Sequence, residues 1–306
     1  MKLLFLFADE NHCDYAFDGL YIGAVNSGHT VDALPLPLGL CNANEKHFYT
    51  RVNGFFKDYL KGKIAPIKQL RDDYDAIIFE SAGIPYKLFP FYKQYGFTQL
   101  WNSSIPKCCV LGNDPFTSQP LPNLRYDYKC KMAIREKALQ TPIVNLPYSA
   151  DFPLHFTIPQ AWLGGNDQRE KDYFFSMSPS NPVRKEFSQK FLNQHYTNIG
   201  EYLNAIRRHK FGLSIFGDGI ECQRDVELGG NTLLAIYKHA RSVYDGSYFT
   251  TDNAIYYSSY ESLIEQTKAL EKSGEYENMR KKCFEFTKQN LTCESQLYKL
   301  LDWLVK

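Results

Sequence analysis

Short apolar runs alternate with amphipathic stretches along the whole chain. Continuous apolar runs predict buried strands, and apolar residues that recur every three or four positions predict helices. The predicted strands cover residues 3–8, 29–36, 75–79, 106–112, 142–146, 172–176, 196–199 and 254–257, with two more inside residues 211–238. The predicted helices cover residues 17–28, 45–60, 88–100, 126–139, 182–192, 201–208, 259–270, 274–287 and 294–305, with a short one inside residues 211–238. Strands that alternate with helices form a largely parallel sheet, so we expect an α/β protein.

The periodicity fades between residues 149 and 170, where proline, glycine and polar residues collect. Such a stretch is typical of a domain junction, and a chain of 306 residues is long enough for two domains. We therefore predict an N-terminal Rossmann-like domain over residues 1–150 and a C-terminal Rossmann-like domain with a helical tail over residues 151–306.

The charges of the chain nearly cancel, with 35 basic and 34 acidic residues. This balance produces no strong electrostatic field, so nucleic acid is not favoured as a partner. The apolar run near the N-terminus is too short for a secretion signal, and no stretch reaches the roughly 18 apolar residues of a membrane span. The eight cysteines form no CxxC pair, which is typical of reduced thiols. We expect a cytoplasmic protein without a membrane span.

Motifs that would identify a cofactor are absent from the sequence. No GxGxxG follows the first predicted strand, and the chain contains no Walker loop, HExxH or GxSxG. The seven histidines are scattered without the spacing of metal ligands. We therefore expect neither a bound metal nor a tightly bound cofactor.

The most informative segment is FGLSIFGDGIECQRDVELGGNTLLAIYK, residues 211–238. It predicts a buried strand, a glycine-bounded acidic loop, a charged helix and a second buried strand. Open α/β sheets bind ligands at the carboxyl ends of their strands, which is where the charged insert begins. Gly217 and Gly219 would let a ligand approach the backbone closely. The side chains that could accept hydrogen bonds from sugar hydroxyls or hold a phosphate there are Asp218, Glu221, Arg224, Asp225 and Glu227. A solvated helix between two core strands fits the same pattern.

A serine-rich loop follows the first predicted strand of the second domain and leads into a helix. Hydroxyls and free N–H groups at a helix N-terminus can hold an anion, and Ser178, Ser180 and Arg184 are candidates for binding a diphosphate. Simple capping is the alternative interpretation. It would place Ser180 or Asn181 at the N-cap and Pro182 at the first helical position.

Three side chains follow predicted strands of the first domain and are candidates for a general base: Asp114, Glu80 and His12. A carboxylate at that edge can accept a proton, and a histidine has an unperturbed pKa closer to neutral pH. Each of them, taken alone, also fits a residue that caps a helix or solvates a loop.

Residues 174–303 resemble the donor half of GT-B glycosyltransferases, and the resemblance extends weakly into the first half of the chain. A QRxxE helix at residues 223–227 follows a GLxxxG strand at residues 212–217, and a helical tail ends the chain. The resemblance is strongest to the spore-maturation-type family of bacterial and viral glycosyltransferases. The exostosin-type donor domain is similar but more remote.

By this resemblance, Glu227 would hold the ribose hydroxyls of a nucleotide sugar, and Arg224 would contact its diphosphate. The chain departs from the family in one respect. The family has a longer interval between its acid and the next glycine than the three positions from Glu227 to Gly230. Alignment on Gly230 would instead put Asp225 in the position of the acid, and the two acids would point to different faces of the helix. The more detailed QRxxE match favours Glu227, and Asp225 is the alternative.

The resemblance implies two Rossmann-like domains that face a cleft, with a C-terminal helix that crosses back to the first domain. It implies metal-independent transfer of a sugar from a nucleoside diphosphate donor, a UDP-sugar foremost, to a hydroxyl of a glycan or another acceptor. The donor would bind the second domain, where Ser178, Ser180 and Arg184 would approach its phosphates. Two alternative functions are a viral DNA-base glucosyltransferase and a non-catalytic protein that binds a sugar nucleotide or a glycan.

Overall fold

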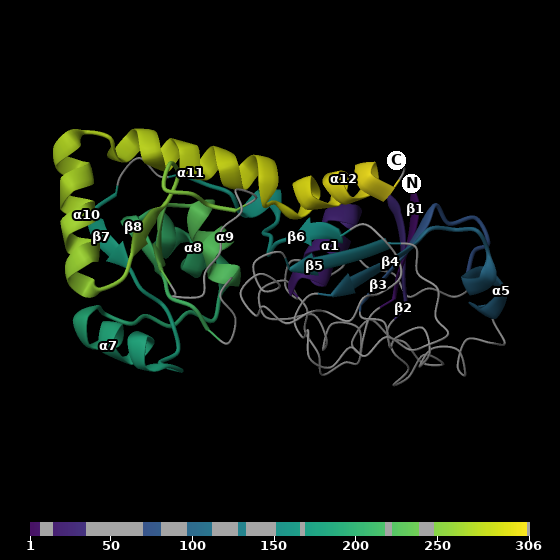
Figure 1. The fold of residues 1–306 in the computed structure, drawn as a ribbon, viewed down its shortest axis with the longest axis horizontal. Coiled ribbons are helices and arrows are strands. Elements are labelled where there is room, and N and C mark those ends of the chain that lie inside the picture. Colours follow the sequence, from purple (N-terminus) through teal and green to yellow (C-terminus); the bar gives the residue numbers. More distant parts are fainter. Residues whose placement is uncertain are drawn as a thin grey trace. The chain divides into compact units, whose positions relative to one another are not determined.

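The computed structural model describes residues 1–6, 15–34, 70–80, 97–111, 128–132, 151–165, 169–217, 222–238 and 248–304. These residues fall into two compact units, each built around one parallel sheet (Figure 1). The first unit contains the described residues up to 132, together with 151–154 and 296–304, and the second unit contains those within 155–295. The predicted α/β fold with parallel sheets is confirmed.

The first unit contains a sheet with the strand order β2-β1-β3-β4-β5-β6, in which every neighbouring pair is parallel. Its strands are β1 (Lys2–Leu6), β2 (Thr30–Leu34), β3 (Ala76–Glu80), β4 (Lys107–Leu111), β5 (Tyr128–Met132) and β6 (Asp151–Leu154). Its helices are α1 (Tyr15–Asn26), α5 (Phe97–Asn102) and, from residue 296 onward, α12 (Cys293–Leu304). All strands point the same way, so their carboxyl ends share one edge of the sheet.

The core of the first unit forms around β1. Residues 3–6 of this strand have no exposed surface, which explains why the sequence shows a continuous apolar run there instead of an alternating one. The ring of Phe5 packs against the rings of Phe17 and Tyr21 in α1, with centroid separations of 5.6 and 5.3 Å. The helical spacing of these aromatic residues is therefore what attaches α1 to the sheet.

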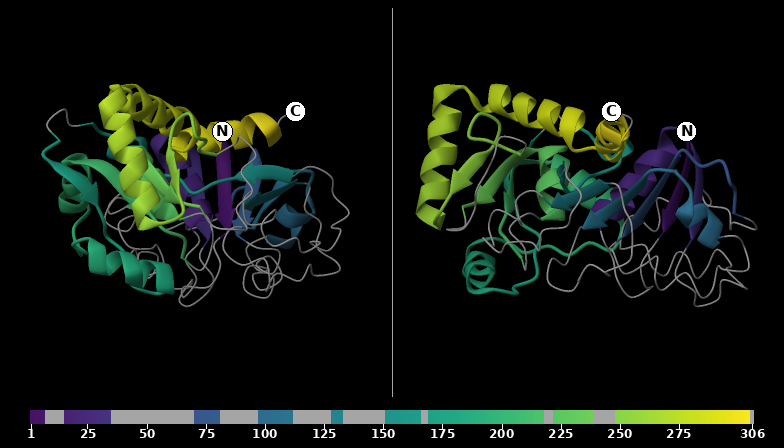
Figure 2. Two further views of the ribbon diagram at one scale, coloured as in Figure 1. Left: turned by 60° about the vertical axis from the view of Figure 1, so that its left-hand side comes forward. Right: turned by 45° about the vertical axis from the view of Figure 1, so that its right-hand side comes forward.

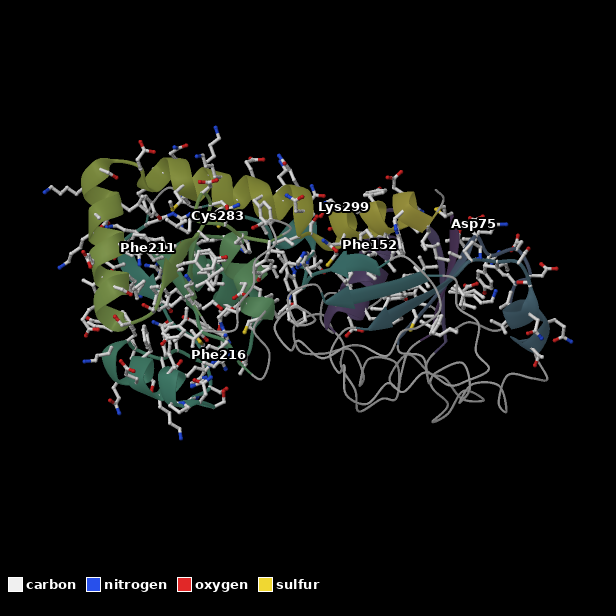
Figure 3. All side chains as sticks on the ribbon, viewed as in Figure 1. Asp75, Phe152, Phe211, Phe216, Cys283 and Lys299 are labelled. Carbon is white, nitrogen blue, oxygen red and sulfur yellow. The ribbon has the colours of Figure 1, made fainter. Side chains whose placement is uncertain are left out.

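The end of the chain also belongs to the first unit. Leu297 and Leu300 of α12 are fully buried. The ring of Trp303 in the same helix packs against Phe152 of β6, with the ring centroids 5.4 Å apart; Figure 3 labels Phe152. The C-terminal helix thus contributes to the core of the first unit, as predicted.

The second unit contains a parallel sheet with the order β10-β9-β8-β7. Its strands are β7 (Lys171–Phe174), β8 (His209–Ser214), β9 (Leu233–Tyr237) and β10 (Ile255–Tyr257). Its helices are η3 (Gln160–Trp162), a short 3₁₀ helix, and α7 (Pro182–Lys190), α8 (Ile199–Arg207), α9 (Gln223–Gly229), α10 (Tyr260–Ser273) and α11 (Tyr276–Asn290). Within the part of the chain that the structure describes, no helix is both long and apolar enough to cross a membrane.

Phe211 and Gly212 show how the two faces of the second sheet are covered. They are neighbours in β8, so they point to opposite faces. Phe211 packs against Tyr276 at the start of α11, with the ring centroids 5.3 Å apart. On the other face, a Cβ placed on Gly212 would lie 2.6 Å from a methyl carbon of Leu228 in α9. Glycine at this position is therefore what allows α9 to pack so closely against β8.

Helices α10 and α11 are joined by a sharp turn, which Figure 2 shows from two sides. The turn occurs at Gly274, which ends α10 with a φ of +76°. Only glycine adopts this left-handed conformation without strain. At its other end, α10 is capped by Ser259, whose hydroxyl accepts a hydrogen bond from Ser262 N at 3.1 Å.

The predicted strand at residues 196–199 is wrong, because this stretch leads directly into α8. Asn198 is the N-cap residue of that helix, and its side-chain oxygen accepts hydrogen bonds from Gly200 N at 2.7 Å and from Glu201 N at 3.2 Å. An asparagine that satisfies two N–H groups of the first turn is a strong signal for the start of a helix. A short run with one aromatic residue is a weaker signal for a strand.

The predicted helix at residues 126–139 is also wrong over its described part. Tyr128–Met132 forms β5 and pairs with β4 on one side and β6 on the other. The alternation of residue types in YKCKM fits a strand, and two neighbouring strands supply its backbone hydrogen-bond partners. The predicted helix at 45–60 and the predicted strand at 142–146 lie outside the described residues.

Replacing Gly212 with alanine tests the packing of α9 on β8. The new methyl group would collide with Leu228 and Thr232, whose nearest carbons would lie 2.6 and 2.7 Å away. We expect Gly212→Ala to lower the free energy of unfolding by about 1–3 kcal/mol, measured by urea denaturation. Gly165→Ala is the control, because its Cβ would meet only Arg280 at 3.5 Å. Equal stability of the two variants would contradict the close packing.

Candidate functional site

The carboxyl ends of β7 and β8 bring several predicted site residues to one edge of the second sheet. These strands are parallel neighbours, so the loops that follow them leave the sheet on the same side. The start of α7 is tied to the end of β8, because the side-chain nitrogen of Asn181 donates to the carbonyl oxygen of Phe216 at 2.9 Å. Figure 3 shows Phe216 close to α7. We call this region the carboxyl edge of the second sheet.

Arg184 is buried at this edge, and its guanidinium is bound by the protein itself. Nε and Nη2 donate to the carbonyl oxygen of Ile215 at 3.2 and 2.8 Å, and Nη1 donates to Oγ of Ser180 at 3.3 Å. A buried cation is costly unless it is hydrogen-bonded, and the backbone at the end of β8 meets this requirement. A Cβ on Gly217 would lie 3.1 Å from Nη2, so glycine leaves room for the guanidinium. The structure thus brings Arg184, Ser180 and Gly217 together.

The serine-rich loop before α7 shows the capping that the sequence allows. Asn181 is the N-cap residue, and its side-chain oxygen accepts a hydrogen bond from Arg184 N at 2.9 Å. Pro182 occupies the first helical position, where a missing N–H has no cost. The side chains of Ser178 and Ser180 are exposed, so the loop also keeps two hydroxyl groups accessible at this edge.

Asp225 is buried in the first turn of α9 and joins this helix to β8. Its Oδ1 accepts a hydrogen bond from the hydroxyl of Ser214, the last residue of β8. Its Oδ2 accepts from Cys222 N at 3.1 Å and from the hydroxyl of Tyr248 at 2.7 Å. Both carboxylate oxygens are therefore bound by the protein, and this acid determines where α9 begins.

Glu227, two positions later, contacts α8 instead of the sheet. Its Oε2 accepts a hydrogen bond from the hydroxyl of Tyr202 at 2.7 Å. Both side chains are buried, with exposed fractions of 8% for Glu227 and 6% for Tyr202. No described residue donates a hydrogen bond to Oε1 of Glu227. Glu227 thus retains an acceptor for a ligand, whereas Asp225 does not.

Arg224 lies near Glu227 and Tyr202. Burial raises the pKa of Glu227, while the hydrogen bond from Tyr202 and the positive charge of Arg224 act in the opposite direction. Burial also raises the pKa of Tyr202, and the charge of Arg224 opposes that shift too. Nε of Arg224 is buried and has no hydrogen-bond partner among the described residues. Because an unpaired buried N–H is costly, this guanidinium is suited to binding an anion.

The remaining predicted site residues are not brought into this region by any described contact. Five of them lie outside the described residues: His12, Asp114, Asp218, Gly219 and Glu221. Glu80 is the last residue of β3, at the carboxyl edge of the first sheet. In the described ranges, no group of three or more His, Cys, Asp or Glu residues could hold a metal ion.

Three residues that complete the site have no clear signal in the sequence: Tyr202, Ser214 and Tyr248. Tyr202 lies on the apolar face of α8 and looks like an ordinary core residue. Ser214 interrupts an otherwise apolar strand end, which is the only local sign of a buried polar contact. The hydroxyl of Tyr248 reaches Asp225 from 23 positions away, so no local pattern relates the two residues.

Three solved structures share the fold over almost the entire chain. HepE from Anabaena, in complex with UDP-glucose, has a TM-score of 0.60 at 10% identity, with 100% of this chain and 100% of that chain covered. A glycosyltransferase from Rickettsia africae ESF-5 has a TM-score of 0.59 at 8% identity, with 99% of this chain and 98% of that chain covered. Sucrose-phosphate synthase from Thermosynechococcus elongatus has a TM-score of 0.52 at 8% identity, with the same coverage of 99% and 98%.

No family model and no curated protein matches the sequence. At such low identities, likeness to a solved structure shows the fold alone. It confirms the GT-B architecture that the sequence predicts.

Asp225→Asn should destabilise the second unit, because asparagine replaces one acceptor oxygen with an NH2 group. At least one of the groups that donate to Asp225 then loses its partner, and we expect the free energy of unfolding to fall by about 1–3 kcal/mol in urea denaturation. Asp172→Asn is the matched control, since the side chain of Asp172 is 68% exposed and, among the described residues, forms an ion pair only with Lys210 at 3.3 Å; its effect should stay within about 0.5 kcal/mol. Two equally small effects would contradict the anchoring role of Asp225.

Glu227→Gln should change how stability depends on pH. The raised pKa of Glu227 means that the folded protein binds this proton more tightly than the unfolded chain does. The contribution of Glu227 to stability is therefore greatest below the ordinary carboxyl pKa and is lost as pH rises through the raised value. The free energies of unfolding of wild type and variant are measured by urea denaturation from about pH 4 to pH 8. The value for wild type minus the value for the variant should fall as pH rises. A difference that does not vary with pH would contradict the shift.

Proposed function

We propose that this protein is a glycosyltransferase that moves a sugar from a nucleoside diphosphate sugar, a UDP-sugar foremost, to an acceptor hydroxyl. The main support is the full-length fold shared with HepE, which has been solved with UDP-glucose, with UDP, and with UDP and glucose. A charged set of side chains at the carboxyl edge of the second sheet adds to this support, because ligands bind at this edge in open α/β sheets. The donor would bind the second unit.

Within the donor site, we assign the diphosphate to Arg224 and the ribose hydroxyls to Glu227. Arg224 has a buried Nε without a partner among the described residues, and a diphosphate oxygen would supply one. Glu227 has an acceptor that no described residue uses, whereas both oxygens of Asp225 are occupied. The site therefore favours Glu227 over Asp225 as the ribose-binding acid.

Ser178, Ser180 and Gly217 would complete the phosphate-binding side of the site. The two serine hydroxyls are exposed, and Gly217 offers backbone without a side chain at the end of β8. Arg184 takes a different role in this proposal. Its donors bind Ile215 and Ser180, so it holds the loop and the strand end in place for the ligand.

In the transfer step, the acceptor oxygen bonds to the anomeric carbon as the bond from that carbon to the diphosphate breaks. The nucleoside diphosphate leaves with the electron pair, and Arg224 would stabilise its charge without a metal ion. If the reaction inverts the anomeric centre, a base must take the proton of the acceptor hydroxyl. We assign this base and the acceptor to the first unit, where Asp114, Glu80 and His12 are the candidates.

Two further assignments belong to the proposal. We place the protein in the spore-maturation-type family of glycosyltransferases, on the basis of the QRxxE helix after the GLxxxG strand. We also place it in the cytoplasm, because the five cysteines whose side chains the structure describes, Cys108, Cys109, Cys222, Cys283 and Cys293, are free thiols.

Binding of a nucleotide sugar is the direct test. Ligands that bind only the folded state raise the melting temperature, so UDP-glucose or another sugar nucleotide should stabilise the wild-type protein in a thermal-shift assay. Arg224→Ala should abolish this stabilisation, because the diphosphate loses its charge partner. Arg208→Ala is the matched control, since Arg208 is exposed beside Glu170, at the amino end of β8.

Three outcomes of this assay are informative. Stabilisation of wild type and Arg208→Ala, with none in Arg224→Ala, supports the donor site. A wild-type protein that no UDP, GDP, TDP or ADP sugar stabilises contradicts the proposed function. Tight binding without hydrolysis or transfer of the sugar to any acceptor would instead identify a non-catalytic sugar-nucleotide-binding protein.

A further inference from the structure

The segment between α7 and α8 places a partly exposed aromatic ring close to the proposed ribose-binding acid. Tyr196 is half-buried. Its ring stacks on Phe174, the last residue of β7, with centroids 6.0 Å apart and planes inclined by 24°. The edge of the same ring meets Tyr202, with the centroids 5.7 Å apart. Tyr202 in turn donates its hydroxyl to Glu227. Tyr196 is thus separated from the acid by a single side chain.

Gln194 adds a polar group beside this ring. Its Oε1 accepts the hydrogen bond that the hydroxyl of Tyr196 donates. Within the part of the chain that the structure describes, no residue accepts a hydrogen bond from its Nε2. The backbone is held at both ends of the segment, because Gln194 N donates to Phe175 O at 3.3 Å and Asn198 caps α8. The ring and the free amide donor are therefore presented by a well-anchored stretch of chain.

The two groups complement the chemistry of a nucleobase. Every base offers a flat π-face that stacks on an aromatic side chain. A carbonyl group on the edge of the base can accept a hydrogen bond from an amide N–H, such as Nε2 of Gln194. Uracil has such carbonyl groups, and adenine has none.

The position of the segment agrees with the geometry of a nucleotide. The base and the ribose hydroxyls are attached to the same sugar ring, so the groups that bind them must be close neighbours. Tyr196 lies one side chain from Glu227, through Tyr202. The phosphates are attached to the opposite end of the ribose, and the exposed hydroxyls of the loop before α7 remain available to them.

We propose that Tyr196 and Gln194 form the nucleobase-binding face of the donor site and select a base with an exocyclic carbonyl, uracil in preference to adenine. This inference rests on the proposed function, because it assumes that Glu227 binds a ribose. Tyr196 supplies the stacking surface, and Gln194 supplies the discrimination between bases.

Titration calorimetry with UDP and ADP tests the two roles separately. Wild type should bind UDP more tightly than ADP. Tyr196→Ala should weaken UDP binding on the order of tenfold, because the stacking surface is lost. Tyr196→Phe keeps the ring and should retain an affinity close to that of wild type. Gln194→Ala should reduce the preference for UDP over ADP while ADP affinity stays the same.

A control variant and a fold check keep the result interpretable. Tyr298→Ala removes a tyrosine that is 55% exposed on α12 and should leave both affinities unchanged. Far-UV circular dichroism and urea denaturation establish that each variant is folded. If Tyr196→Ala does not fold, the ratio of UDP to ADP affinity in Gln194→Ala decides the outcome.

The failure of this inference is distinguishable from the failure of the proposed function. Suppose that wild type binds UDP and that Tyr196→Ala and Gln194→Ala have the same affinity and the same preference as wild type. This result overturns the base-binding face but does not contradict the donor site. Equal binding of UDP and ADP by wild type overturns the selection by Gln194. Wild type that binds neither UDP nor any sugar nucleotide overturns both proposals.

Discussion

The buried carboxylate of Asp225 is the interaction on which the carboxyl edge of the second sheet depends. A carboxylate inside a protein must have hydrogen-bond donors, because burial without them costs several kcal/mol or more. Here the donors come from Ser214 at the end of β8, from the backbone at Cys222, and from Tyr248. The hydrogen bonds to this one carboxylate therefore fix the position of the start of α9 relative to the strand that precedes it.

Arg184 is a second buried charge that binds the chain at the end of β8. Its guanidinium binds the carbonyl oxygen of Ile215, directly after β8, and so positions α7. These two buried charges organise the edge, but their hydrogen bonds to the protein leave them poorly suited to a ligand. Arg224 and Glu227 differ from them, because each retains a polar atom that no described residue satisfies. The same helix thus carries one acid that builds the site and one acid that is available for binding.

Much of the fold could be predicted from the sequence, because its signals are local. The apolar run at residues 3–6, the proline at the start of α7, and the glycine that ends α10 each act within a few residues of the chain. One of the two errors has a local cause and the other a tertiary one. Residues 196–199 lack the length of a strand, and the cap at Asn198 prevails. At Tyr128–Met132, neighbouring strands on both sides decide in favour of β5.

The sequence by itself determined the α/β class and the strand–helix–strand segment at residues 211–238, with a charged helix after its first strand. Its QRxxE match favours Glu227 over Asp225 as the ribose-binding acid, but it does not show what either side chain contacts. Only the tertiary structure decided which partners each acid has, by bringing Tyr248 to Asp225 and Tyr202 to Glu227. The physical reason is that a buried charge takes its partners from wherever the fold places them, and no local pattern in the chain records those partners.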